Sequence, residues 1–352
     1  MTTLPDPGSA ADYPRELRSG PWPTSHVQGV AVDRARGHVY YSFTTLLVKT
    51  DLAGTILGTL EGMTGHLGDI TFNDDDGRLY SSLEYKAAPA FYIAIVDVAK
   101  IDRVGMQAQD SELMSTVLLR EVVDDFTADV DGDGVFDGDT ADTADHRYGC
   151  SGIDGTTFGP AFGRTDGPRF LTVAYGVYSH TGRTDNDHQV LLQYDISGWR
   201  DLERPLTEAA PHRSGPDRPD GKYFVFTGNT TFGVQNLEYD AGLQRWFLAV
   251  YPGKKDQYPN YQLFAIDATA QPTLAPLRGL DGEAGLLLPL AEDGLSDPET
   301  GLRGWNQNAT VGFESLGDGL FFISTSTRAG GHGSILRLHR WTGEVDQPFA
   351  AV

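Results

Sequence analysis

The sequence lacks several features that would place it quickly in a class. Its 352 residues include one cysteine, Cys150, so an internal disulfide is excluded. No apolar run approaches the roughly 20 residues that span a bilayer as a helix. Basic residues are scarce, because 27 Lys and Arg stand against 49 Asp and Glu and leave a net charge of −22. We therefore expect neither nucleic acid nor a membrane as a partner, since both need a basic face.

The first 20 residues are polar and interrupted by proline, without the apolar core of a signal peptide. We expect a cytoplasmic protein, or a secreted one whose signal peptide is absent from this sequence. Phosphate-binding glycine motifs, zincin motifs and nucleophile elbows are also missing. The oligomeric state stays open.

Short β-rich runs separated by glycine-rich turns dominate the rest of the chain. After a lead-in over residues 1–25, four such runs predict a four-stranded antiparallel meander at 26–62. The unit recurs at about 66–123, 150–228, 232–291 and 309–350. This pattern predicts an all-β fold, a five-bladed β-propeller of four-stranded antiparallel blades that forms one domain over residues 1–352. A sixth blade in the insertion described next is the alternative, although apolar runs are missing there.

A long Asp-rich insertion, residues 103–147, separates blades two and three. It contains Asp129, Asp131, Asp133 and Asp137 at loop positions 1, 3, 5 and 9, with Gly134 at position 6. This spacing resembles EF-hand-like and thrombospondin-type calcium loops and predicts a structural Ca²⁺ site. Position 12 is Thr140, so a helix–loop–helix unit is not expected. A disordered acidic loop is the alternative.

Carboxylates recur where the chain enters the innermost strand of each blade. These strands surround the axis of a propeller, so we expect their polar side chains to converge at one mouth. The candidate catalytic groups are Asp69, Asp154, Glu238 and Glu314, with His180 from a neighbouring loop. Gln28 and Asn236 would bind substrate beside them. Oxygen ligands of this kind suit Ca²⁺ or Mg²⁺ at the centre.

Basic residues occur in the loops between the second and third strands of four blades. Lys86, Arg183, Lys254 and Arg328 are the candidates for substrate binding, together with Tyr148 in the His146–Gly155 stretch. Cations around an acidic centre favour an anionic ligand.

These patterns leave three functions open. The first is a metal-dependent hydrolase acting on an anionic small molecule or ester, such as a phosphoester or lactone. The second is a glycoside hydrolase with paired carboxylates, and the third is a non-catalytic propeller that binds a small-molecule or saccharide ligand. The blade plan over about 26–349 resembles arabinanase-like glycosidases and calcium-dependent apyrases, and more loosely lactonase propellers. The resemblance is architectural and implies no particular catalytic residue.

Overall fold

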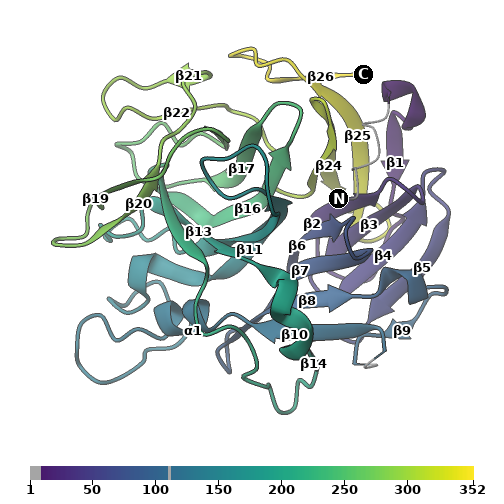
Figure 1. The fold of residues 1–352 in the computed structure, drawn as a ribbon, viewed down its shortest axis with the longest axis horizontal. Helices are drawn as coiled ribbons and strands as arrows, with labels where there is room; N and C mark the ends of the chain where they lie inside the picture. The colour runs from purple at the N-terminus through teal and green to yellow at the C-terminus, as the bar shows by residue number, and fades with distance from the viewer. Residues whose placement is uncertain (1–8, 110–111) are drawn as a thin grey trace.

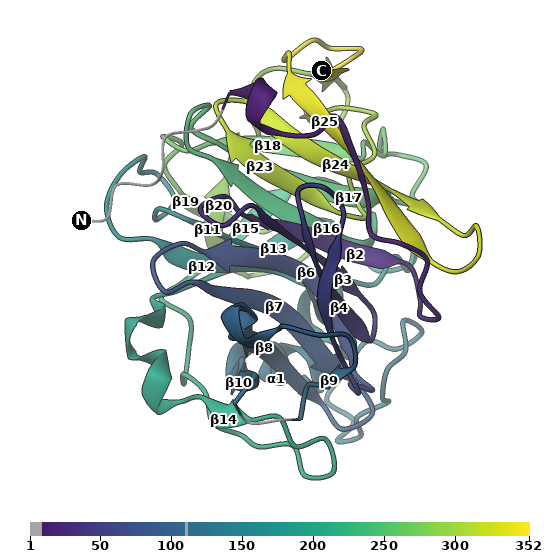
Figure 2. The same ribbon diagram turned by 90° about the vertical axis from the view of Figure 1, so that its right-hand side faces the viewer.

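The computed structural model describes residues 9–109 and 112–352 and shows a five-bladed β-propeller (Figures 1 and 2). Antiparallel sheets stand around a common axis, which confirms the predicted fold class. Residues 1–8 of the expected lead-in and residues 110–111 of the expected insertion lie outside the described residues. None of the described helices is long and apolar enough to cross a membrane.

The first two blades each contain a meander of four strands. Blade one consists of β2 (Val27–Asp33), β3 (His38–Phe43), β4 (Leu46–Asp51) and β5 (Ile56–Glu61), with β9 (Met106–Gln107) parallel to β5. Blade two consists of β6 (His66–Asn73), β7 (Arg78–Tyr85), β8 (Ala90–Val96) and β10 (Met114–Leu118), with β14 (Arg204–Pro205) at its edge. The tight turn between β6 and β7 ends at Gly77, which adopts a φ of +69° that favours glycine.

Blade three is wider than predicted and blade four is narrower. Blade three consists of β11 (Cys150–Gly159), β12 (Phe170–Val177), β13 (His188–Tyr194), β15 (Gly221–Phe226), β20 (Ala284–Leu288) and β19 (Thr273–Pro276). Blade four consists of β16 (Thr230–Asp240), β17 (Arg245–Pro252) and β18 (Leu263–Asp267). The run at 285–290 was expected as the outer strand of blade four, but β20 pairs in parallel with β15 of blade three. Trp305, beside the small β21–β22 hairpin (Leu295–Ser296 and Arg303–Gly304), pairs with Leu263 at the outer edge of blade four instead.

Blade five joins the two ends of the chain. It consists of β23 (Phe313–Gly317), β24 (Leu320–Thr327), β25 (Gly333–Trp341), β26 (Phe349–Ala351) and the amino-terminal β1 (Glu16–Arg18). β1 pairs with one end of β25 and β26 with the other, and Figure 1 shows β1 beside β25. The expected irregular lead-in thus contributes a strand that closes the ring.

The core consists of apolar clusters between neighbouring blades. Ala31 and Tyr40 of blade one, for example, pack with Ile70 and Leu83 of blade two. Similar clusters fill the other four junctions. Short helices connect the blades: η1 (Ala10–Asp12), η2 (Val98–Lys100), α1 (Arg120–Phe126), η3 (Arg147–Gly149) and η4 (Ile196–Asp201). This packing gives the polar axis a rigid wall.

Candidate functional site

The innermost strands β2, β6, β11, β16 and β23 lie next to one another around the axis. Residues from the first halves of β2, β6, β11 and β16 line one cavity, and residues near the ends of these four strands, together with β23, line another. The strands therefore run in the same direction, and the axis has two chemically distinct ends. We call these hollows the first and the second axial cavity.

The first axial cavity has a volume of about 800 Å³. Its polar walls include Gln28, His66, Glu84, Lys86, Asp154 and Gln235. Its aromatic walls include Tyr85, Phe232 and Tyr251. A cavity of this size accommodates a small organic molecule.

Glu84 and Lys86 form an ion pair in the wall of this cavity. The ammonium nitrogen of Lys86 lies 3.4 Å from Oε1 of Glu84, and the backbone N–H of Ile153 donates to Oε2 over 3.2 Å. Burial raises the pKa of Glu84, and the charge of Lys86 partly offsets this rise. Burial acts to lower the pKa of Lys86, but Glu84 and Asp139 raise it above its usual value. Lys86 therefore favours the ionised form of Glu84, while burial opposes it.

Asp154 is a second buried carboxyl in the same cavity. Its Oδ1 accepts a weak hydrogen bond of 3.3 Å from the backbone N–H of Asp69. Burial raises the pKa of Asp154 well above its usual range, and the negative charge of Glu84 raises it further. A side chain at Gly68 would collide with this carboxyl group, so glycine is required there. Asp154 thus holds its proton more strongly than an exposed aspartate, and it lacks the ammonium partner that Glu84 has in Lys86.

His66 lies beside Glu84 and stays neutral. Burial lowers the pKa of His66 to about 4. The amide nitrogen of Gln28 lies 3.1 Å from Nε2 of His66, which accepts, so the ring proton is on Nδ1. Nδ1 faces Oε1 of Glu84 at 3.6 Å. The histidine therefore lies beside the carboxylate without adding a charge.

Asp69 and Asn236 form a polar plug between the two cavities. The amide of Asn236 donates to Oδ1 of Asp69 over 2.6 Å and to the carbonyl of Gln28 over 2.8 Å, and it accepts from Gly312 N–H. Oδ2 of Asp69 accepts from the N–H groups of Thr156 and Leu237. These bonds link all five blades. The bonded residues lie in the inner strands of four blades, and Gly312 directly precedes the inner strand of the fifth.

Glu238 and Glu314 lie at the opposite end of the axis from Asp154, in the second axial cavity. Glu314 accepts from Val32 N–H, near the end of β2. The structure therefore separates the four carboxylates that were expected at one mouth. The reason is that β16 begins at Thr230, earlier than the expected Val234, so Glu238 falls near its end.

The other predicted residues are dispersed. Arg183 is buried and donates to the carbonyls of Thr143, Asp145 and His146, which fastens the Asp-rich insertion to blade three. Tyr148 donates to Glu283 and stacks under Lys222. His180, Lys254 and Arg328 are exposed, and His180 lies 3.7 Å from Asp142. Of the predicted cations, Lys86 alone is among the residues that line the first axial cavity.

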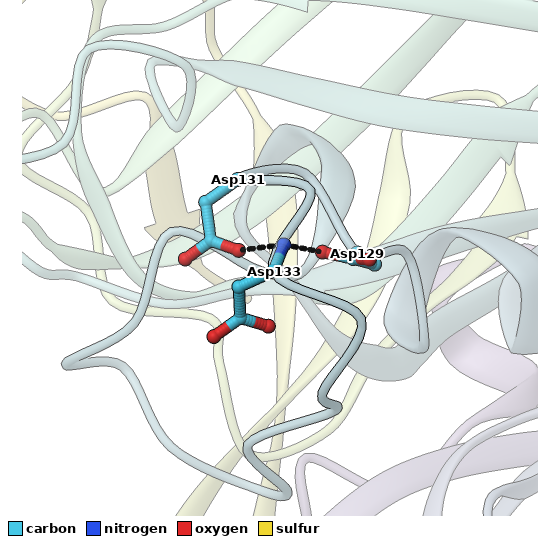
Figure 3. A group of neighbouring side chains, drawn as sticks. All are labelled: Asp129, Asp131 and Asp133. Carbon is cyan, nitrogen blue, oxygen red and sulfur yellow. Dashed lines mark hydrogen bonds between the residues drawn. The ribbon is translucent and has the colours of Figure 1, made fainter.

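The Asp-rich loop brings three predicted metal ligands together. Carboxylate oxygens of Asp129, Asp131 and Asp133 lie within 4.8 Å of one another on the surface. Figure 3 shows the backbone nitrogen of Asp133 between the side chains of Asp129 and Asp131, to which it donates. Asp137 is outside this group and accepts from the hydroxyl of Thr143. Among the described residues, no other group of three metal-ligating side chains is this close.

Two residues that line the first axial cavity, Glu84 and His66, are not among the candidate residues predicted from the sequence. The structure extends β7 to Tyr85 and starts β6 at His66, so that the two residues are opposite each other in the ladder. The alternation of Leu79, Ser81 and Leu83 toward one face would have indicated that Glu84 belongs to the strand.

Comparisons with known proteins identify no family. No protein-family model and no curated protein matches the sequence. Among solved structures, the chain is similar to the Dos1 propeller, with 11% identity and a TM-score of 0.36 over 93% of this chain and 70% of that one. It is also similar to a protein of unknown function from Bacteroides caccae, with 10% identity and a TM-score of 0.29 over 76% of this chain and 87% of that one.

Proposed function

We propose that this protein is a hydrolase that cleaves a glycosidic bond in the first axial cavity by acid–base catalysis. In this proposal Asp154 is the general acid and Glu84 is the base or nucleophile. The observation that carries the proposal is the pair of buried carboxyls in one cavity, of which Glu84 has an ammonium partner. Two carboxyls whose surroundings separate their pKa values are suited to the opposite roles of acid and base.

The walls of the cavity favour a neutral, polar substrate. Asp154 donates a hydrogen bond when protonated, and Gln28 and Gln235 offer amides. Phe232 is 53% exposed and adopts a φ of +64°, a conformation that is costly for an aromatic residue. An exposed ring held under strain at a cavity wall suits contact with the apolar face of a sugar.

A central divalent cation, the leading expectation from the sequence, has less support. Lys86 already occupies the position beside Glu84 that a cation would take. Glu238 and Glu314 belong to the other cavity. Metal-dependent hydrolysis of a phosphoester or lactone therefore becomes an outcome of the test, as does saccharide binding without turnover.

The test is a screen of aryl glycosides, phosphoesters and lactones with the wild type and two variants. We expect glycoside cleavage that Asp154→Asn and Glu84→Gln each reduce by about 100-fold or more, because each removes a proton-transfer group. Glu238→Gln is the matched control, since it replaces an equally buried carboxyl by an amide at the other end of the axis. It should retain near-normal activity.

Chelation separates the alternatives. Glycoside cleavage that survives EDTA supports the proposal, whereas an EDTA-sensitive phosphoesterase or lactonase activity refutes it. If saccharides raise the unfolding temperature but are never cleaved, the protein is a binding propeller.

A further inference from the structure

The second axial cavity, at the end of the axis opposite Asp154, has a volume of about 700 Å³. It is lined by two arginines, Arg34 and Arg169, and by Phe72 and Phe158, among other residues. Six acidic residues also line it: Asp74, Asp75, Asp166, Glu238, Glu314 and Asp318. Two arginines in one hollow are notable in a chain with a net charge of −22.

Each guanidinium group has one carboxylate at ion-pair distance but beyond hydrogen-bond distance. Nη1 of Arg169 has no hydrogen-bond partner, and its nearest carboxylate oxygen, on Asp75, lies 3.8 Å away. Nη2 of Arg34 lies 3.7 Å from Asp74, while its Nη1 donates to the carbonyl of Leu316. These separations exceed a hydrogen bond, so N–H donors remain for a ligand. A buried unpaired donor is also costly, which favours an acceptor that binds it.

The glutamates supply less negative charge than their number suggests. Burial raises the pKa of Glu314 to about 8, and burial together with Glu314 raises the pKa of Glu238 well above its usual range. Each carboxyl is therefore more readily protonated than an exposed glutamate, and the pair carries less negative charge than two ionised carboxylates would. A protonated carboxyl donates a hydrogen bond and does not repel an anion.

We propose that the second axial cavity binds a small organic acid, whose carboxylate pairs with Arg34 and Arg169 while its apolar body contacts Phe72 and Phe158. Planar guanidinium groups match a carboxylate geometrically. A single negative charge suits the site better than a phosphate dianion, because Asp74 and Asp75 stay nearby. This site is independent of the proposed hydrolase function, whose residues lie in the other cavity.

The first experiment titrates the full-length wild type with benzoate, benzamide and inorganic phosphate, each up to about 20 mM, by calorimetry. Benzamide has the shape of benzoate without its charge, so this comparison needs no variant. We expect saturable binding of benzoate that is at least about tenfold tighter than binding of benzamide or phosphate. No saturable binding of benzoate, or equal binding of benzamide, would overturn the proposal, and tighter binding of phosphate would overturn the carboxylate class.

Variants then locate the site. Arg169→Gln should weaken benzoate binding about tenfold or more, and Arg169→Lys, which keeps the charge, should weaken it less. Arg103→Gln, at an exposed arginine paired with Asp102, is the matched control and should bind normally. Lys86→Met should also bind normally. Loss of binding in Lys86→Met with retention in Arg169→Gln would place benzoate in the first cavity and refute the proposal.

Discussion

Replacement of Asp69 by asparagine would measure how the buried axial carboxyls couple stability to pH. Burial raises the pKa of Asp69 to about 8, although hydrogen bonds from Thr156, Leu237 and Asn236 act in the opposite direction. An aspartate in an unfolded chain has a pKa of about 3.9. Between these two values the folded protein holds a proton that the unfolded chain has released.

This difference in proton binding decides whether the protein becomes more or less stable as the pH rises. The stabilisation is fully present below about pH 4 and is lost as the pH rises toward 8, at about 1.4 kcal/mol per pH unit. Asp69 alone should therefore lower the free energy of unfolding by about 2 kcal/mol between pH 6 and pH 8. Asparagine cannot lose a proton, so Asp69→Asn should lack this component. Relative to that of the wild type, the free energy of unfolding of the variant should therefore rise by about 2 kcal/mol from pH 6 to pH 8.

Urea unfolding followed by tryptophan fluorescence at pH 6, 7 and 8 would test this. His66 and His188, whose burial lowers their pKa values to about 4, contribute equally to both proteins and cancel from the difference. Asp102→Asn, at an exposed side chain, is the control for removing one carboxyl. If Asp69→Asn changes the free energy of unfolding by the same amount at every pH, Asp69 does not titrate in this range and the reasoning fails.

Three further predictions concern other parts of the chain. Lys86→Met removes the ammonium group beside Glu84, so the pKa of Glu84 should rise and the acid limb of the pH–activity profile should move to higher pH; an unmoved limb would separate Lys86 from catalysis. In the calcium interpretation of the Asp-rich loop, Ca²⁺ should protect the wild type from limited proteolysis there and should not protect Asp129→Asn; equal protection of both proteins would contradict it. Leu17→Ala removes the buried side chain of β1 and should lower the free energy of unfolding by roughly 2–5 kcal/mol in urea; a loss below about 1 kcal/mol would mean that β1 contributes little to ring closure.

The blade plan could be predicted because its signals are local. Alternating runs and turn residues within a few positions define each hairpin, and Asp51 illustrates this by accepting from Ala53 N–H and Thr55 N–H in the turn after β4. Pairings between distant segments have no such signal. β20 is an apolar run that two different blades could have used, and β1 forms only because β25 offers a free edge.

The division of the carboxylates could not be predicted because it depends on where each inner strand begins. β16 contains irregular pairing between Thr231 and Asn236, which lengthens its first half. Glu238 is the ninth of the eleven residues of β16 and therefore lies near the end of the strand, where it lines the second cavity. Asp154, in β11, stays close to the first cavity. A difference of a few residues in strand length thus decides which of the two cavities a side chain lines.

The plug of Asp69 and Asn236 explains why the two ends can have separate chemistries. The amide of Asn236 was expected to bind substrate, but both of its donors and its acceptor bond within the protein. Because these bonds join different blades, a change at this amide would leave buried partners unpaired and would disturb the register of the inner strands. A change confined to Glu238 or to Lys86 leaves the plug intact. A variant at either residue can therefore serve as the control for the opposite cavity. If a variant in one cavity altered binding or catalysis in the other, the change would have to be transmitted through Asp69 and Asn236.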